Sequence, residues 1–430
     1  MNQYANMIRM LKTPHVMERL TQLYGSRDGM LVSQTMRLIS LLKRHEEQVG
    51  ADGNVLIISA PGRSEIGGNH TDHQRGKVLT AAVNLDTVAA VSPRADDVVR
   101  VLSEGYAPVE ISLSDLSMRP REKGTTAALV RGVAARMSEL GYTLGGFDAA
   151  VTSTVRSGSG LSSSAAFEVL VCAIFDALYN GWRMEKRERA VISQYAENQY
   201  FGKPSGLLDQ MASSVGGLTF IDFKEDTAKV SEIAYDFAAK GVALVVVNTG
   251  GSHGDLIDDY AAIPREMGAV AACFGEKVLR RVRPEQFRQA IPTLRDQVSD
   301  RAILRAAHFF DENARVCEEV EALKRDDLDA FYRAVIASGQ SSFMYLQNVY
   351  ARQDAQELSL ALMLAQSRLS GKGAWRVHGG GFAGTTLNFV PQKEVKGFQK
   401  EMEAVFGPHC CNVIDVRPEG AACLDLSGKD

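Results

Sequence analysis

The segment RSGSGLSSSA, residues 156–165, decides the fold because it joins two apolar runs of different periodicity. The preceding run FDAAVTSTV (147–155) is typical of a strand, and from Ser162 onward apolar residues recur at helical spacing. Glycines between a strand and a helix let backbone N–H groups turn inward and meet an anion at the helix N-terminus. A phosphate-binding loop is therefore favoured over a flexible linker, which would not run straight into an apolar helix. The pattern matches neither the P-loop nor the Rossmann fingerprint.

A second polar loop, GRSEIGGNHTDH, spans residues 62–73. It follows the strand-like run NVLIISA (54–60) through a Pro-Gly pair that we expect to begin a loop. Its side chains both donate and accept hydrogen bonds, as the hydroxyls of a sugar require. A polar surface turn would also explain this segment. A metal site at His70, Asp72 and His73 is possible, but no second ligand cluster supports it.

Two further segments carry candidate chemistry. Glu197 is followed by GLLDQ (206–210), in which Asp209 lies in an apolar context and needs either a partner or an unusual pKa. A satisfied core acid or helix cap is the common alternative. HGGGFAG (378–384) lets the backbone come close to a ligand, although a tight bend would use the same glycines.

A serine hydrolase is a competing interpretation. GGSHG (250–254) fits the G-x-S-x-G nucleophile elbow, and HGGG (378–381) resembles a lipase oxyanion loop. In that fold, however, the oxyanion loop precedes the elbow, whereas here it follows. The hydrolase hypothesis also leaves the loops at 62–73 and 157–164 unexplained.

Composition excludes several classes of protein. The chain has 430 residues, 45% hydrophobic and 23% charged, as in globular proteins. Lys plus Arg (48) nearly balances Asp plus Glu (52), which speaks against a nucleic-acid partner. No apolar run is long enough for a membrane span, and the N-terminus does not resemble a signal peptide. The six cysteines include no CxxC pair, which favours reduced thiols in the cytoplasm.

The order of strands and helices favours the α+β class, since βα alternation is irregular. The length predicts more than one domain. We expect a helical extension at residues 1–50, an N-terminal domain at 51–235 that holds the sugar and phosphate loops, and a C-terminal domain at 236–430. The oligomeric state is left open.

Taken together, these segments resemble the galactokinases of the GHMP small-molecule kinase superfamily. The family motifs GRxNxIGEHTDYxGG, PxGxGLSSSA, GIMDQ and GGGFGG resemble, in this order, residues 62–76, 156–165, 206–210 and 379–384. The resemblance runs from about residue 55 to the end of the chain. It implies a two-domain GHMP kinase fold with the active site in the cleft between the domains, and ATP and Mg²⁺ as cofactors.

The resemblance also implies roles for the matching residues. Asp209 would accept the proton of the anomeric hydroxyl or orient it, and Arg63 would hold Asp209 ionised and neutralise charge on the transferred phosphoryl group. Ser162 and Glu197 resemble the family's Mg²⁺ ligands. The expected ATP-binding residues are Gly158, Ser159, Gly160, Leu161, Ser162, Ser163 and Ser164, and the expected sugar-binding residues are Asn69, His70, Asp72, Gly206 and Tyr260.

Departures from the family pattern concentrate near the sugar. Asn69 and His73 stand where the family has Glu and Tyr, Arg156 replaces a Pro, and His378 replaces Ser or Thr. We therefore expect an ATP-dependent sugar 1-kinase that acts on galactose. A galactose relative such as galacturonate is the alternative substrate, because Asn69 removes a negative charge that would repel a carboxylate. A non-catalytic sugar and ATP sensor is a further alternative, opposed by the intact Arg63 and Asp209.

Overall fold

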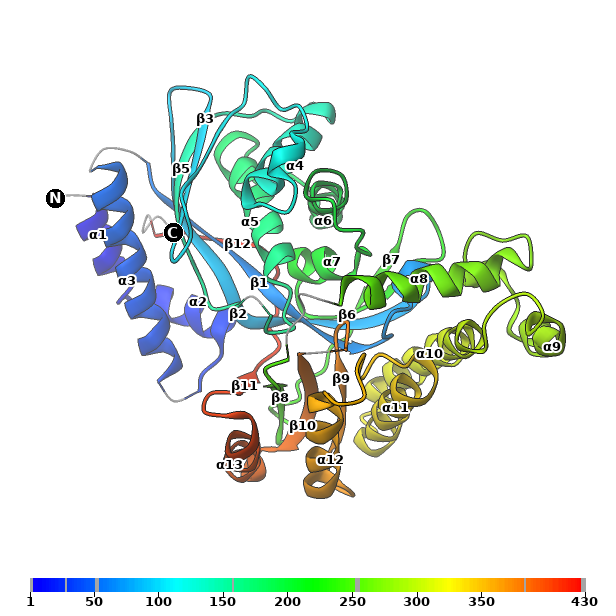
Figure 1. Cartoon of the computed structure of the whole chain (residues 1–430). Coiled ribbons are helices and arrows are strands. Elements are labelled where there is room, and N and C mark those ends of the chain that lie inside the picture. Colours follow the sequence, from blue (N-terminus) through cyan, green and yellow to red (C-terminus); the bar gives the residue numbers. More distant parts are fainter. Residues whose placement is uncertain are drawn as a thin grey trace.

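In the computed structural model, which describes residues 3–27, 29–50, 54–156, 158–251, 256–382 and 384–426, the strands form two sheets (Figure 1). The first sheet runs in the order β12-β1-β2-β5-β3-β4, with β6 paired to β2 and β7 to β6. Its strands are β1 (Leu56–Gly67), β2 (Lys77–Pro93), β3 (Val98–Ser103), β4 (Val109–Ser112), β5 (Phe147–Ser153), β6 (Leu218–Asp222), β7 (Lys229–Glu232) and β12 (Ala422–Leu424). Only the β3–β5 pair among these is parallel.

The second sheet is antiparallel and runs in the order β11-β8-β10-β9. Its strands are β8 (Val242–Asn248), β9 (Ala374–His378), β10 (Thr385–Pro391) and β11 (Cys411–Ile414). Helices α12 (Glu357–Leu369) and α13 (Val395–Phe406) pack on it at the bottom of Figure 1. The mixed sheets and helices confirm the α+β class. The chain passes from the first sheet to the second between β7 and β8, yet β12 returns from the end of the chain to pair with β1.

Helices α1 (Gln3–Met10), α2 (Pro14–Tyr24) and α3 (Met30–Val49) cover one face of the first sheet (Figure 1). Their apolar side chains share a core with residues from β1, β2, β5 and β12. Tyr24 and Arg37 add polar contacts, since both bond the buried carboxylate of Asp86 on β2. The predicted N-terminal extension is therefore an integral layer of the fold.

The remaining helices frame the site. On the other face of the first sheet lie α4 (Thr126–Glu139), α5 (Ser163–Tyr179), α6 (Lys186–Tyr195) and α7 (Leu208–Val215), and a π-helix (Ala196–Phe201) extends α6. The chain after β8 forms α8 (Ile257–Ala272), α9 (Pro284–Leu294), α10 (Asp300–Lys324) and α11 (Leu328–Ser341), and a second π-helix (Ser342–Leu346) extends α11.

One local expectation was wrong. Strand β1 does not end at Pro61-Gly62 but continues to Gly67, with register shifts against β2 between Pro61 and Arg63 and between Glu65 and Gly67. A β-bulge redirects the side chains that follow it. The bulged end of β1, and not a free loop, therefore carries Arg63 into the site.

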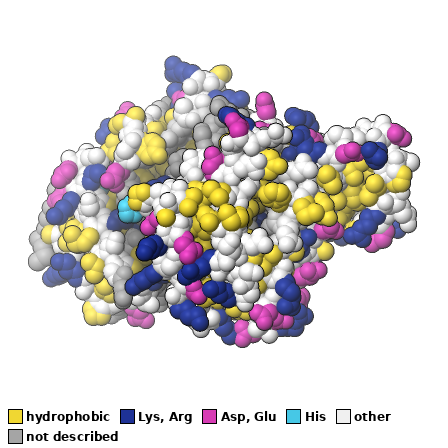
Figure 2. Space-filling view, turned by 60° about the horizontal axis from the view of Figure 1, so that its bottom comes forward, with side chains coloured by type: hydrophobic (Ala, Val, Ile, Leu, Met, Phe, Trp, Pro, Cys, Tyr) yellow, Lys and Arg dark blue, Asp and Glu magenta, His cyan; other side chains and the backbone are white. Residues whose placement is uncertain are grey.

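The surface agrees with the near-neutral composition. Figure 2 shows basic and acidic side chains interspersed over the face that it presents, without a broad basic patch. None of the helices in the described residues has the length and apolarity that crossing a membrane requires.

Candidate active site

The glycine-serine loop lies between β5 and α5 and borders a pocket of about 320 Å³, which we call the central pocket. Gly158 and Gly160 have φ angles of 74° and 73°, which glycine adopts without steric cost. A Cβ at Gly160 would also overlap the Thr385 hydroxyl. The pocket is lined by Arg63, Arg156, Gly158, Ser159, Gly160, Ser162, Ser163, Ser164, Glu197, Phe201, Lys203, Asp209, His378, Gly379, Gly380, Gly381 and Thr385.

The positive end of α5 faces this loop, which suits an anion. Six of the seven expected ATP-binding residues line the central pocket. The exception is Leu161, whose side chain is 1% exposed and packs in the core. Its carbonyl oxygen accepts a hydrogen bond from the Arg63 amide at 3.0 Å, which fixes the loop to β1.

Arg63 and Asp209 form a two-point ion pair in the central pocket. The Arg63 Nε lies 2.5 Å from Asp209 Oδ1, and its Nη2 lies 3.0 Å from Oδ2. Ser162 Oγ donates to Asp209 Oδ2 at 2.6 Å. Burial raises the pKa of Asp209, but the charge and hydrogen bonds of Arg63 and the Ser162 hydroxyl outweigh it and hold that pKa below its usual value. Asp209 is therefore an ionised carboxylate at neutral pH.

Glu197 lies in the π-helix and is 1% exposed. Four side chains donate to its carboxylate. Ser164 Oγ and Lys203 Nζ each lie 2.9 Å from Oε1, while Ser205 Oγ lies 2.5 Å and Gln210 Nε2 2.8 Å from Oε2. These four hydrogen bonds satisfy both oxygens of the buried carboxylate.

The chemistry of Ser162 and Glu197 fits Mg²⁺. Both supply hard oxygen ligands, and Mg²⁺ in nucleotide sites takes one or two protein ligands together with phosphate oxygens and waters. The described residues contain no group of three or more His, Cys, Asp or Glu side chains that could hold a metal ion without such help. In this structure the Lys203 ammonium occupies the Oε1 side of Glu197.

His378 ends β9 and binds both sheets together. The Glu65 backbone N–H donates to His378 Nε2 at 3.3 Å, so Nε2 carries no proton. His378 Nδ1 therefore carries the proton and donates to Thr385 Oγ1 at 3.1 Å. Burial, together with the charges of Arg63 and Arg376, lowers the pKa of His378 well below its usual value. His378 is therefore a neutral side chain that links β1 of the first sheet to β10 of the second.

Three of the five expected sugar-binding residues bond carbonyl groups of the glycine turn between β9 and β10. His70 Nε2 lies 2.9 Å from the Gly380 carbonyl oxygen, and Tyr260 Oη donates to the Gly381 carbonyl at 2.7 Å. Gly206 packs directly on the Asp72 carboxylate, which an added Cβ would overlap. The structure therefore brings His70 and Tyr260 to this turn, and it places Asp72 against Gly206, which precedes the helix that carries Asp209.

Asn69, the fifth expected sugar-binding residue, lies beneath this surface and is 0% exposed. Its Nδ2 donates to Glu65 Oε1 at 2.8 Å and to the Gly379 carbonyl at 2.7 Å. Its Oδ1 accepts from Asn348 Nδ2 at 2.8 Å and from Ser342 Oγ at 3.2 Å. Protein groups thus use both N–H donors and both lone pairs of the oxygen of this amide. A sugar contact at Asn69 stays a prediction.

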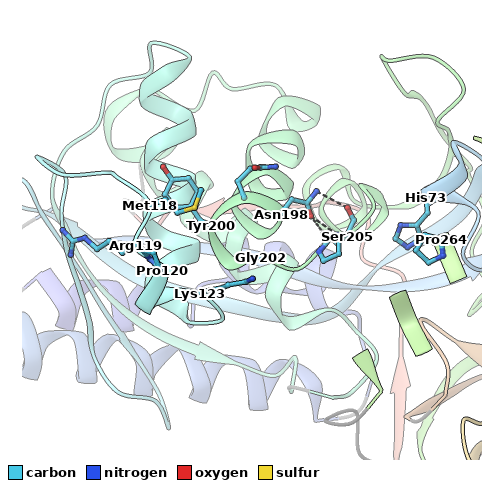
Figure 3. A pocket seen from close by; sticks show the side chains of 12 residues that line it. His73, Met118, Arg119, Pro120, Lys123, Asn198, Tyr200, Gly202, Ser205 and Pro264 are labelled. Carbon is cyan, nitrogen blue, oxygen red and sulfur yellow. Dashed lines mark hydrogen bonds between the residues drawn. The ribbon is translucent and has the colours of Figure 1, made fainter. Parts of the chain in front are cut away.

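A separate groove of about 750 Å³ runs along the π-helix (Figure 3). His73 and Pro264 lie at one end and Arg119 at the other, and the Asn198–Ser205 hydrogen bonds lie between them. Ser205 both borders this groove and bonds Glu197 of the central pocket. The two hollows therefore share one wall.

Sequence reasoning missed two groups at the site. One is Lys203, which bonds Glu197. It lies in the sequence between the candidate residues Glu197 and Gly206, and this position is the signal that could have identified it. The buried Arg376–Glu65 pair, with Nη2 2.8 Å from Oε1, joins β9 to β1 and had no local signal. Burial raises the pKa of Glu65 to about 7, against the opposing charges of Arg376 and Arg63.

The hydrolase motifs do not gain support. Ser252, His253 and Gly254 of the elbow-like GGSHG lie outside the described residues. His378 and the glycines after it border the phosphate loop, where Gly379 and Gly160 are neighbours.

Comparison with known proteins agrees with this geometry. Residues 43–93 match the galactokinase galactose-binding signature, and residues 128–217 match the N-terminal domain of the GHMP kinases. The chain is 33% identical to the galactokinase of Streptomyces coelicolor over 85% of this chain and 92% of that protein. It is 32% identical to the galactokinase of Glaesserella parasuis over 84% and 92%. The crystal structure of Lactococcus lactis galactokinase with galactose superposes with a TM-score of 0.78 at 23% identity, covering 90% of this chain and 99% of that one.

Proposed function

The chain belongs to the galactokinase family, and on this premise we propose that it is a sugar kinase that transfers the γ-phosphoryl group of ATP to the anomeric hydroxyl of galactose. The observation that carries the proposal is the Arg63–Asp209–Ser162 cluster beside the phosphate loop. It joins an ionised carboxylate, a guanidinium and backbone donors in one pocket. These are the groups that phosphoryl transfer to a hydroxyl requires.

In the proposed reaction Asp209 orients the anomeric hydroxyl and receives its proton as the O–P bond forms. The guanidinium of Arg63, fixed by Asp209 and by the Gly160 carbonyl at 2.5 Å, stabilises the negative charge that develops on the transferred group. The transition state of phosphoryl transfer is loose, so positioning and charge stabilisation supply most of the acceleration.

Ser162 and Glu197 would hold Mg²⁺, which when bound neutralises charge on the β- and γ-phosphates. Amides of residues 158–164 would hold the same phosphates at the start of α5. Asp72, His70, Gly206 and Tyr260 would border the sugar. Asp72 is the clearest of these four, because a carboxylate accepts hydrogen bonds from vicinal hydroxyls.

The test is an assay of ADP release with ATP and four acceptors: galactose, galacturonate, glucose and N-acetylgalactosamine. We expect the highest kcat/KM with galactose and a product phosphorylated at the anomeric position, identified by phosphorus NMR. The absence of turnover with every hexose would refute the sugar-kinase assignment. Preference for galacturonate would retain the reaction and change the substrate.

A further inference from the structure

Lys203 contributes a positive charge to the central pocket that no part of the proposed reaction uses. It follows the π-helix directly after Gly202, and its Nζ lies 2.9 Å from Glu197 Oε1. Its side chain is 55% exposed, whereas that of Glu197 is 2% exposed. The ammonium therefore stands at the open side of a buried carboxylate, on the wall that faces the phosphate loop.

Glu197 does not depend on Lys203 for its hydrogen bonds. Ser164, Ser205 and Gln210 still donate to the carboxylate when the lysine is removed. The lysine is the only one of the four donors with a long flexible side chain that is more than half exposed. The Lys203 ammonium can therefore move away from Glu197 while the other three hydrogen bonds remain. Its movement would expose Glu197 Oε1 to a metal ion.

The balance of charges in the central pocket favours an interaction between Lys203 and a bound triphosphate. Arg63, Arg156 and Lys203 are its cationic side chains, and Glu197 and Asp209 its carboxylates. Without Lys203 the cationic and acidic side chains would balance, leaving no net positive charge for a triphosphate.

We propose that Lys203 is a phosphate-binding residue, whose ammonium moves from Glu197 to a β- or γ-phosphate oxygen when ATP enters the central pocket. The inference rests on the proposed function, because it takes ATP as the ligand. An ammonium with three donors can bond one phosphate oxygen and retain a second contact. Glu197, released by the lysine, would then be free to hold Mg²⁺, while Lys203 would add its own charge at the same phosphates.

The test compares equilibrium binding of ATP and AMP, measured by calorimetry without Mg²⁺, in Lys203→Met and the wild-type protein. AMP lacks the β- and γ-phosphates. We expect Lys203→Met to weaken ATP binding by about 10- to 100-fold, as for the loss of one charge-assisted hydrogen bond, and to leave AMP binding within twofold. Lys203→Arg, which keeps the charge, should recover most of the ATP affinity.

A matched control is Lys240→Met. Lys240 also pairs with one carboxylate, that of Asp326, and its side chain is 43% exposed, but it precedes β8 at the end of the strand away from the central pocket. This variant should bind both nucleotides as the wild type does. ATP affinity within twofold in Lys203→Met, or equal losses for ATP and AMP, would overturn the proposal while leaving the kinase intact. A wild-type protein that binds no ATP would instead refute the proposed function.

Discussion

Gly206→Ala tests whether the Asp72 carboxylate borders the sugar. Gly206 precedes α7, and a Cβ built on its backbone would overlap the Asp72 carboxylate. The φ angle of Gly206 is not in the left-handed region, so the alanine meets a steric obstacle and no backbone strain. The carboxylate must rotate or shift, while the Arg63–Asp209 ion pair on the next turn is not touched.

The size of the effect follows from what Asp72 loses. Its side chain is 13% exposed and Oδ1 accepts from the His73 amide at 2.9 Å, so Oδ2, the atom that the alanine would displace, is the oxygen left for a ligand. A hydrogen bond between a charged group and a sugar hydroxyl contributes about 1.5–3 kcal/mol. Its loss corresponds to a decrease in kcat/KM for the sugar of about 10- to 150-fold.

The assay is steady-state kinetics at saturating ATP, with ATP binding measured separately. We expect the kcat/KM for the sugar to fall and the ATP affinity to stay within twofold. Gly268→Ala is the control, because Gly268 lies inside α8 with open space around it and alanine there adds about 1 kcal/mol of helix stability. If the clash with Asp72 causes the effect, Gly206→Ala should not lower kcat/KM further in a protein that already carries Asp72→Ala. Full additivity, or wild-type kcat/KM in Gly206→Ala, would refute the reasoning.

Three further predictions follow from buried charges. Asp209→Asn should lower kcat by about 10²- to 10⁴-fold while ATP binding persists, measured by turnover and calorimetry, and retained turnover would exclude Asp209 as the acid-base group. Glu319→Gln should raise the melting temperature more at pH 8 than at pH 5, because burial and the charge of Glu312 raise the pKa of this carboxyl, which has no hydrogen-bond partner in the described residues. Equal shifts at both pH values would contradict this. Arg37→Met should lower the free energy of unfolding by about 3 kcal/mol in urea titrations, since it removes one partner of the fully buried Asp86, and a change below 1 kcal/mol would show that Arg417 alone compensates the charge.

The sequence alone predicts the features that are local along the chain. The strand, glycine loop and helix around residues 147–179 follow from periodicity and from glycine placement, and the structure has β5, the loop and α5 there. The hairpin at 374–391 is predicted for the same reason. Contacts between residues that are far apart in the sequence cannot be predicted from such local patterns. The amide of Asn69 bonds residues 273 and 279 positions away, and no local pattern reveals that it is buried.

The course of β1 shows a second limit. A Pro-Gly pair usually ends a strand, yet β1 continues because its bulges let β2 follow it to Gly67. Lys203 shows a third limit, since its contact with Glu197 spans six residues, a spacing that neither an α-helix nor a strand brings together. The π-helix and the left-handed Gly202, with φ 84°, create the contact.

Buried polar contacts join the two sheets next to the central pocket, and we call them the joint. Their ionisable side chains make the stability of this region depend on pH. Arg376 on β9 bonds Glu65 on β1, and Glu312 on α10 accepts from the Gly68 amide at 3.0 Å. Because the pKa of Glu65 is about 7 in the folded state and 4.5 in the unfolded state, its contribution to stability is greatest below pH 4.5 and is lost as the pH rises through 7. Asp209 behaves oppositely, since its lowered pKa favours folding at every pH above its usual value. Alkaline pH therefore weakens the joint through Glu65 while Asp209 of the catalytic pair stays ionised.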